Sequence, residues 1–199
     1  MDDHSTAPDA PALDLPPLRV VFEWTGDRWT HRLEVSGNPL ARPVDLAPEA
    51  ENPARVVSPA YQQLEFQDAP DGSGRQALGV GQTGPHHFSA VFWSRRIDGR
   101  PAIDVDVADR SRANIEFLAA TYTVFRTSGD LLSADERRIS WSIDADHVLE
   151  LHALGDAALC LSEAGRSATR IQIVARLHTA EKTHRCRWRW TLESRSSEL

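Results

Sequence analysis

Hydrophobic and polar residues alternate along most of the chain, which is typical of β-strands that bury one face. The first alternating run covers residues 18–24. A second run, residues 29–35, follows a short polar connection that contains Gly26 and Asp27. Two period-two runs on either side of a Gly-Asp turn predict a β-hairpin. We therefore expect regular structure to begin at Leu18 with two paired strands.

Further alternating runs follow, separated by segments rich in Gly, Asp and Ser. They cover residues 61–66, 76–80, 86–96, 102–107, 115–126, 138–143, 147–154 and 168–177. In the last and most regular run, residues 184–192, His, Cys and Trp share one face and Arg takes most of the other. About ten short strands joined by turns predict an all-β fold, either an antiparallel β-sandwich or a flattened β-barrel. The sandwich is the favoured form.

The two ends of the chain lack this periodicity. Residues 1–17 are acidic and rich in Ala and Pro, and residues 194–199 show no apolar pattern either. Such segments cannot bury enough apolar surface to offset the entropy lost on ordering. We expect a disordered N-terminal arm and a flexible tail around a single β domain of residues 18–193.

Two internal regions also depart from the strand pattern. Residues 37–59 contain Pro39, Pro43, Pro48, Pro53 and Pro59. Because proline interrupts both helices and central strands, we expect a long surface connection there. Short helical turns are compatible only with residues 108–120 and 131–137, the latter with a serine and a glutamate at capping-box spacing.

The composition narrows the classes of partner. Hydrophobic residues make up 41% of the chain and charged residues 26%, as in ordinary globular proteins. The formal net charge is −7, so we expect no nucleic-acid partner, which would need a strongly segregated basic face. The chain lacks both an apolar run of about 20 residues and an N-terminal export pattern, so neither a membrane partner nor secretion is expected. Cys160 and Cys186 form no metal-binding motif, which favours two free, buried thiols in a reducing cytoplasm.

The string Gly79-Val80-Gly81-Gln82-Thr83-Gly84 matches the G-x-G-x-x-G pattern of dinucleotide-binding loops. In such folds the glycines open a helix whose N-terminal amides hold the phosphates. Here Pro85 follows, and residues 86–93 alternate as a strand does. We interpret the string as a turn between two strands and expect no cofactor.

Several histidines could serve a metal or acid–base site. His86 and His87 are adjacent, but neighbours on an extended strand point to opposite faces. A metal site built across strands would combine His31, His184, one of these two histidines and a carboxylate such as Glu150. The alternative function for the chain is accordingly a metal-dependent or acid–base enzyme acting on a small polar substrate within a β-barrel.

Other catalytic patterns receive less support. Asp104 and Asp106 share a strand face, a spacing open to calcium or glycoside chemistry, but a solvated outer face explains them better. The chain has no G-x-S-x-G motif. We predict no catalytic and no metal-binding residue.

Six tryptophans are a large number for this length. Four of them stand on the apolar side of their strands and are expected in the core: Trp24, Trp141, Trp188 and Trp190. Trp93 instead shares a strand face with polar residues, and mixed aromatic and polar faces suit ligands. The predicted ligand-binding residues are His87, Trp93, Arg95, His86 and Ser89.

The sequence therefore favours a non-catalytic binding or interaction module. Its ligand would be a small molecule, a glycan or a protein. If the arginine-rich segment Arg185–Arg189 were an edge strand, it could also dock a partner or a second copy of the chain.

Overall fold

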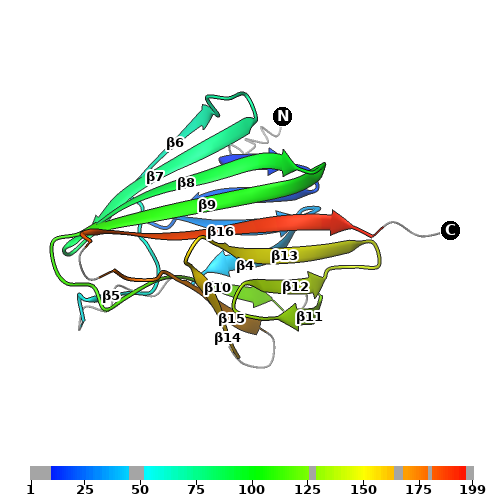
Figure 1. Cartoon of the computed structure of the whole chain (residues 1–199). Coiled ribbons are helices and arrows are strands. Elements are labelled where there is room, and N and C mark those ends of the chain that lie inside the picture. The colour runs from blue at the N-terminus through cyan, green and yellow to red at the C-terminus, as the bar shows by residue number, and fades with distance from the viewer. Residues whose placement is uncertain (1–9, 45–51, 126–128, 164–167, 179–180, 196–199) are drawn as a thin grey trace, which may run out of the picture.

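The computed structural model of the chain describes residues 10–44, 52–125, 129–163, 168–178 and 181–195, and these form an all-β structure without helices (Figure 1). The strands are β1 (Ala12–Leu15), β2 (Leu18–Trp24), β3 (Trp29–Val35), β4 (Asn38–Pro43), β5 (Arg55–Val56), β6 (Gln63–Asp68), β7 (Gly74–Thr83), β8 (His86–Ile97), β9 (Arg100–Ser111), β10 (Phe117–Phe125), β11 (Asp130–Ala134), β12 (Arg138–Ser142), β13 (His147–Leu154), β14 (Ala158–Glu163), β15 (Ala168–Val174) and β16 (Thr183–Ser194). No helix that could cross a membrane occurs among the described residues.

The strands form two eight-stranded sheets, which lie face to face (Figure 1). Sheet I has the order β1-β2-β3-β4-β10-β15-β14, and β5 pairs in parallel with β10. Sheet II has the order β11-β12-β13-β16-β9-β8-β7-β6, and every pairing within it is antiparallel. Neither sheet closes on itself. The predicted antiparallel β-sandwich is therefore confirmed, and the barrel alternative is not.

The core lies between the sheets, because the inward positions of both are apolar. Aromatic side chains bridge the two layers. Phe22 of β2 meets Phe92 of β8 with ring centroids 5.2 Å apart, and Tyr122 of β10 lies 5.7 Å from Trp190 of β16. Trp188 and Trp190 are almost fully buried, as predicted. Aromatic pairs in edge-to-face contact add to the stabilisation from burial.

The predicted hairpin is confirmed, since β2 and β3 pair in register from Leu18 with Val35 to Trp24 with Trp29. Regular structure begins earlier than expected, however. β1 lies within residues 1–17, pairs with β2 and buries Leu13 completely. The composition of residues 1–17 predicted disorder because it does not reveal that β1 can pair with the edge of β2. Residues 1–9 and 196–199, also expected to be disordered, lie outside the described residues.

The expected loop at residues 37–59 contains two strands, β4 and β5. β4 is an inner strand of sheet I, although it carries two prolines. Pro39 stands beside a register shift between β3 and β4, and Pro43 is the last residue of β4. Strand ends and bulges tolerate a missing N–H, so the prolines do not prevent the pairing.

Three other expectations are corrected by the sheet order. Residues 108–120 and 131–137 hold parts of β9, β10 and β11 rather than helical turns, because their backbone groups pair with neighbouring strands. The arginine-rich strand β16 lies between β13 and β9 and is not an edge. Trp24 is 49% exposed instead of buried. It ends β2 at the hairpin turn and lies against Trp29, with ring centroids 5.6 Å apart.

The glycine string lies mostly within β7, and only its last residue belongs to the turn between strands that the sequence predicted for the whole string. Gly79 and Gly81 lie in β7, and Gly84 has a positive φ in the two-residue connection to β8. The segment Ala60–Gln62 crosses close to β7. A Cβ at Gly81 would lie only 2.1 Å from the Ala60 carbonyl oxygen.

Replacing Gly81 by Ala is therefore expected to destabilise the protein by about 1–3 kcal/mol, because the crossing segment must shift. Urea unfolding would measure the loss. Val80→Ala on the same strand is the control, since Val80 is 43% exposed and its truncation should change stability by less than about 0.5 kcal/mol. Equal stability of Gly81→Ala and the unchanged protein would contradict the close approach.

Candidate functional site

A cleft of about 1020 Å³ opens across the ends of β8, β9 and β16. These three strand ends meet at one side of the molecule, near β5 (Figure 1). Residues 112–115, which follow β9, and residues 177, 178, 181 and 182, which precede β16, complete the walls. We call this hollow the end cleft. Its volume is at the upper limit of typical pockets for small organic ligands.

Backbone hydrogen bonds hold the walls of the end cleft together. The Ser111 N–H donates to the Lys182 carbonyl at 3.1 Å, and the Arg112 N–H donates to the Pro85 carbonyl at 3.2 Å. The Ala113 N–H donates to Oγ of Ser111 at 3.1 Å. The cleft is therefore formed by paired backbone and does not need a ligand to shape it.

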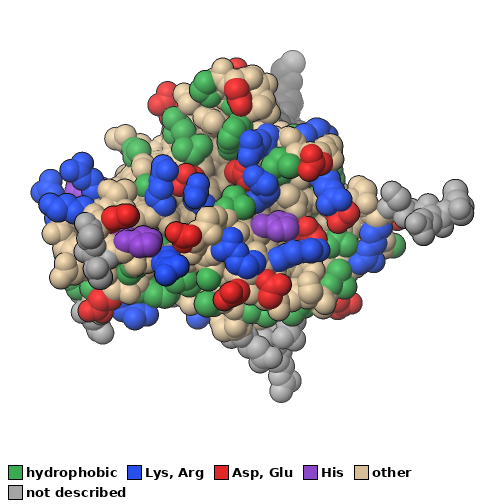
Figure 2. Space-filling model, in the orientation of Figure 1, with side chains coloured by type: hydrophobic (Ala, Val, Ile, Leu, Met, Phe, Trp, Pro, Cys, Tyr) green, Lys and Arg blue, Asp and Glu red, His purple; other side chains and the backbone are tan. Residues whose placement is uncertain are grey.

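Positive charge gathers at this cleft. Arg110, Arg112 and Lys182 line it, and Glu181 is the one carboxylate among the lining residues. The three basic side chains form no ion pair with any described carboxylate. Figure 2 shows Lys and Arg side chains grouped at the same end of the molecule. In a protein of net charge −7, this local excess of positive charge favours anions.

Several arginines elsewhere on the outer face of sheet II are different, because they pair with carboxylates. Arg95 donates from Nε to Asp104 at 2.8 Å, and Arg189 also contacts Asp104. Arg138 pairs with the buried Glu150. Figure 2 shows acidic and basic side chains mixed over this face. The basic residues of the end cleft thus differ from these paired arginines, although Arg187 on the outer face of β16 also has no ion pair with a described carboxylate.

Three histidines also line the end cleft: His87, His178 and His184. His184 is only 6% exposed, and its Nδ1 has no hydrogen-bond partner among the described residues. Leaving a buried polar atom unpaired costs about 1–3 kcal/mol, so such atoms usually meet a ligand or water. His184 thus stands in the cleft wall with one ring nitrogen unpaired among the described residues.

The structure separates the predicted site residues into two groups. His87, Ser89, Trp93 and Arg95 alternate along the outer face of β8, as expected. His87 lies opposite Arg110 of β9 and lines the end cleft. Trp93 and Arg95 lie farther along the strand, where the Arg95 guanidinium stacks 4.0 Å above the Trp93 ring. Asp104 also binds this guanidinium, so Arg95 is held over the Trp93 ring and covers one face of it.

His86 lies on the inner face of β8 and is buried. Its Nδ1 is 2.7 Å from Oδ2 of Asp109, and its Nε2 is 2.6 Å from the Pro53 carbonyl oxygen. Burial alone would lower the pKa of His86, but the hydrogen bonds to Asp109 and Pro53 and the Asp109 charge outweigh it and raise the pKa. His86 thus ties the segment before β5 to sheet II.

The residues of the metal hypothesis are not brought together. No group of three His, Cys, Asp or Glu side chains with metal-binding geometry occurs in the described part of the chain. Asp104 and Asp106 pair with arginines on the outer face. Both cysteines are free, but Cys160 is exposed rather than buried because it stands on the outward side of edge strand β14. Burial raises the pKa of Cys186 to about 12.

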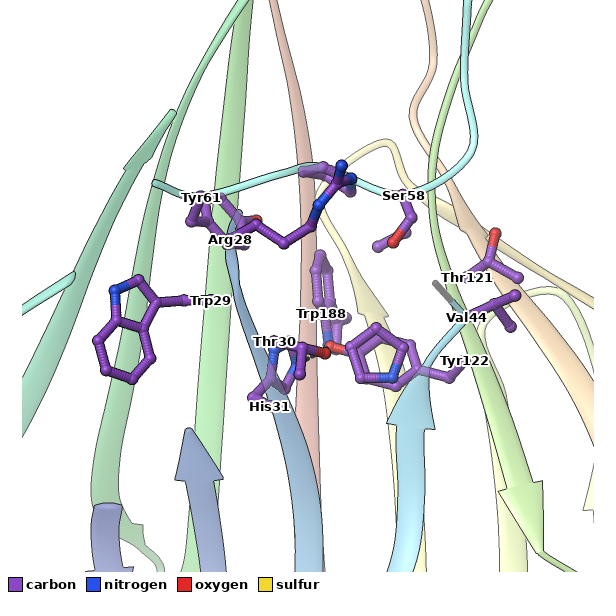
Figure 3. Close-up of a pocket in the computed structure, with 13 residues that line it drawn as sticks. Arg28, Trp29, Thr30, His31, Val44, Ser58, Tyr61, Thr121, Tyr122 and Trp188 are labelled. Carbon is purple, nitrogen blue, oxygen red and sulfur yellow. Dashed lines mark hydrogen bonds between the residues drawn. The ribbon is translucent and has the colours of Figure 1, made fainter. Parts of the chain in front are cut away.

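His31 lies in a second, much smaller cavity of about 30 Å³, shown in Figure 3. Its Nε2 shares a 2.7 Å hydrogen bond with the Tyr122 hydroxyl, and Trp188 lies beside them. Burial lowers the pKa of His31 to about 3 and raises that of Tyr122. The pair is therefore uncharged at neutral pH. A cavity of this size holds about two water molecules, which is too little for an organic ligand.

No protein-family model matches the chain, and no curated protein matches it significantly in sequence. The site must therefore be judged from its own geometry.

Sequence reasoning found His87 but missed most of the end cleft. Arg110 and Arg112 lie within residues 108–120, where the sequence was compatible with a short helical turn, and Lys182 lies between the alternating runs 168–177 and 184–192. Their common signal is a basic residue at the end of an alternating run. Bringing residues 110 and 182 together requires the pairing of β9 with β16, which the sequence does not show.

The His86–Asp109 pair predicts a pH dependence of stability. Because the pKa of His86 is raised in the folded state, its contribution is fully present below about pH 6.5, the ordinary value, and is lost as the pH rises through the folded pKa. Urea unfolding between pH 6 and pH 9 should therefore show decreasing stability. The double variant His86→Phe/Asp109→Leu should lack this slope, whereas His87→Gln, the neighbour on the opposite face, should keep it. An unchanged slope in the double variant would contradict the assignment.

The His31–Tyr122 hydrogen bond can be tested by Tyr122→Phe. The substitution leaves a buried ring nitrogen of His31 unpaired and should cost about 1–3 kcal/mol in the free energy of unfolding, measured in urea. Tyr61→Phe is the matched control, because no hydrogen bond of its hydroxyl to a described residue is present, and its loss should be smaller. Equal losses would argue against the bond.

Proposed function

We propose that this protein is a non-catalytic binding module whose ligand is a small anion, bearing a phosphate or carboxylate group, held in the end cleft. The observation that carries the proposal is the set of unpaired basic residues there. Arg110, Arg112 and Lys182 have no carboxylate partner among the described residues, whereas Arg95, Arg138 and Arg189 on the adjoining sheet face do.

The geometry of the cleft supports the same conclusion. His87 and Arg110 are directly opposite each other on β8 and β9, and Lys182 immediately precedes β16, the next strand. Their side chains therefore start from neighbouring strand ends and can converge on one group. Guanidinium groups bind phosphate and carboxylate through two parallel hydrogen bonds, and such charge-assisted bonds are the stronger ones.

Binding is favoured over catalysis because the residues of the cleft supply charge and hydrogen bonds without an oriented nucleophile and base. Ser111 Oγ accepts a backbone hydrogen bond, and its strand partner His86 has both ring nitrogens engaged by the protein. The cytoplasm remains the proposed location, in keeping with two free thiols.

The proposal predicts that inorganic phosphate binds and that Arg110→Gln and Lys182→Gln each weaken it by about tenfold, the effect of losing one charge-assisted hydrogen bond. Isothermal titration calorimetry at low salt would measure the dissociation constants. Arg187→Gln is the matched control, because it removes the same charge from the exposed outer face of β16 away from the cleft. Equal weakening by all three variants would show only a general charge effect, and no phosphate binding would overturn the proposal.

A further inference from the structure

The end cleft has a second kind of wall. Besides its basic residues it is lined by Ala113, Ile115 and Leu177. Ile115 and Leu177 are only partly buried, and both pack against the hydrophobic core. Each therefore presents apolar surface on the cleft side. Apolar surface in a large hollow is typical of a site for an apolar part of a ligand.

The two kinds of wall come from different sheets. The basic residues His87, Arg110 and Lys182 stand at strand ends of sheet II. Ile115 instead precedes β10 and Leu177 follows β15, which are neighbouring strands of sheet I. A backbone bond from the Ala175 N–H to the Leu118 carbonyl, 2.9 Å, continues that pairing toward the cleft. A molecule in the cleft is therefore charged on one side and apolar on the other.

The volume of the cleft also favours a ligand with both a charged and an apolar part. At about 1020 Å³ it is far larger than a bare phosphate or acetate ion needs, and it suits a drug-sized molecule. An inorganic anion would leave the side chains of Ile115 and Leu177 in contact with water. A hydrocarbon group joined to the anion would cover them, and apolar burial favours binding.

Resting on the proposed function, we infer that the ligand is an amphiphilic anion, with a phosphate or carboxylate head toward sheet II and a hydrocarbon body against Ile115 and Leu177. The head is recognised by Arg110, Lys182 and His184. The body sets the selectivity against inorganic phosphate and small carboxylates.

The test compares four probes by calorimetry with the full chain: inorganic phosphate, hexyl phosphate, hexanoate and hexanol. Hexyl phosphate is expected to bind at least tenfold more tightly than inorganic phosphate, and hexanol should bind far more weakly than either hexyl phosphate or hexanoate. The stronger of the two hexyl anions identifies the head group.

Leu177→Ser and Ile115→Thr locate the hydrocarbon body. Each should weaken hexyl phosphate about three- to tenfold and leave inorganic phosphate unchanged. Leu161→Ser, at an exposed leucine of β14 outside the cleft, is the control and should change neither affinity. Phosphate affinity itself reports that each variant is folded.

The outcomes separate the inference from the proposed function. Equal affinities for hexyl phosphate and inorganic phosphate, or a hexyl advantage that survives both cleft substitutions, would overturn the amphiphilic ligand while leaving anion binding in place. Failure of every anion to bind would overturn both.

Discussion

The two sheets are held together by the burial of one face of each against the other, and this constraint decides where every other group can be. The long strands β8, β9 and β16 place apolar side chains inward at every second position, so their charged residues must face outward or stand at the strand ends. Along the outer face several of the charges form ion pairs with one another. At the strand ends, where the layers no longer cover each other, polar groups from both faces of sheet II reach the same hollow.

One polar interaction is nevertheless placed inside this apolar layer. Asp109 is fully buried and is tied to His86, whose other nitrogen meets the Pro53 carbonyl. Removing two charges from water is costly, and a buried pair repays that cost only with good geometry and additional hydrogen bonds. What the pair contributes here is position. The hydrogen bond from His86 to Pro53 joins the connection before β5 to sheet II. Because His86 is the neighbour of His87 on β8, this bond also helps to fix the position of the cleft wall.

The sequence predicted the fold class and the residues on each strand face, because alternation is a local property. It predicted the β2–β3 hairpin, the inward Trp188 and Trp190, and the outward His87. It failed where position depends on a distant partner. β1 is ordered by β2, and β4 by two neighbours despite Pro39 and Pro43.

In the candidate site, too, some positions follow from the local sequence and others depend on distant strands. His87 could be placed on an outer face from its own neighbours in the sequence. Its partners Arg110 and Lys182 could not, because they meet only through the β8–β9–β16 order. Sequence spacing also cannot show that Arg95 is already held by Asp104, whereas Arg110 is not.

The contrast between Arg95 and Arg110 also explains why the net charge is a poor guide to this surface. An exposed ion pair contributes little to stability, but it removes both charges from the field that a ligand meets. Asp104, Asp106 and Glu150 of sheet II pair with arginines beside them, so these three carboxylates act only weakly on the end cleft. At physiological salt, charges more than about 8 Å away are largely screened. A small anion approaching the cleft therefore responds to the local charges, three basic side chains and Glu181, rather than to the formal charge of −7.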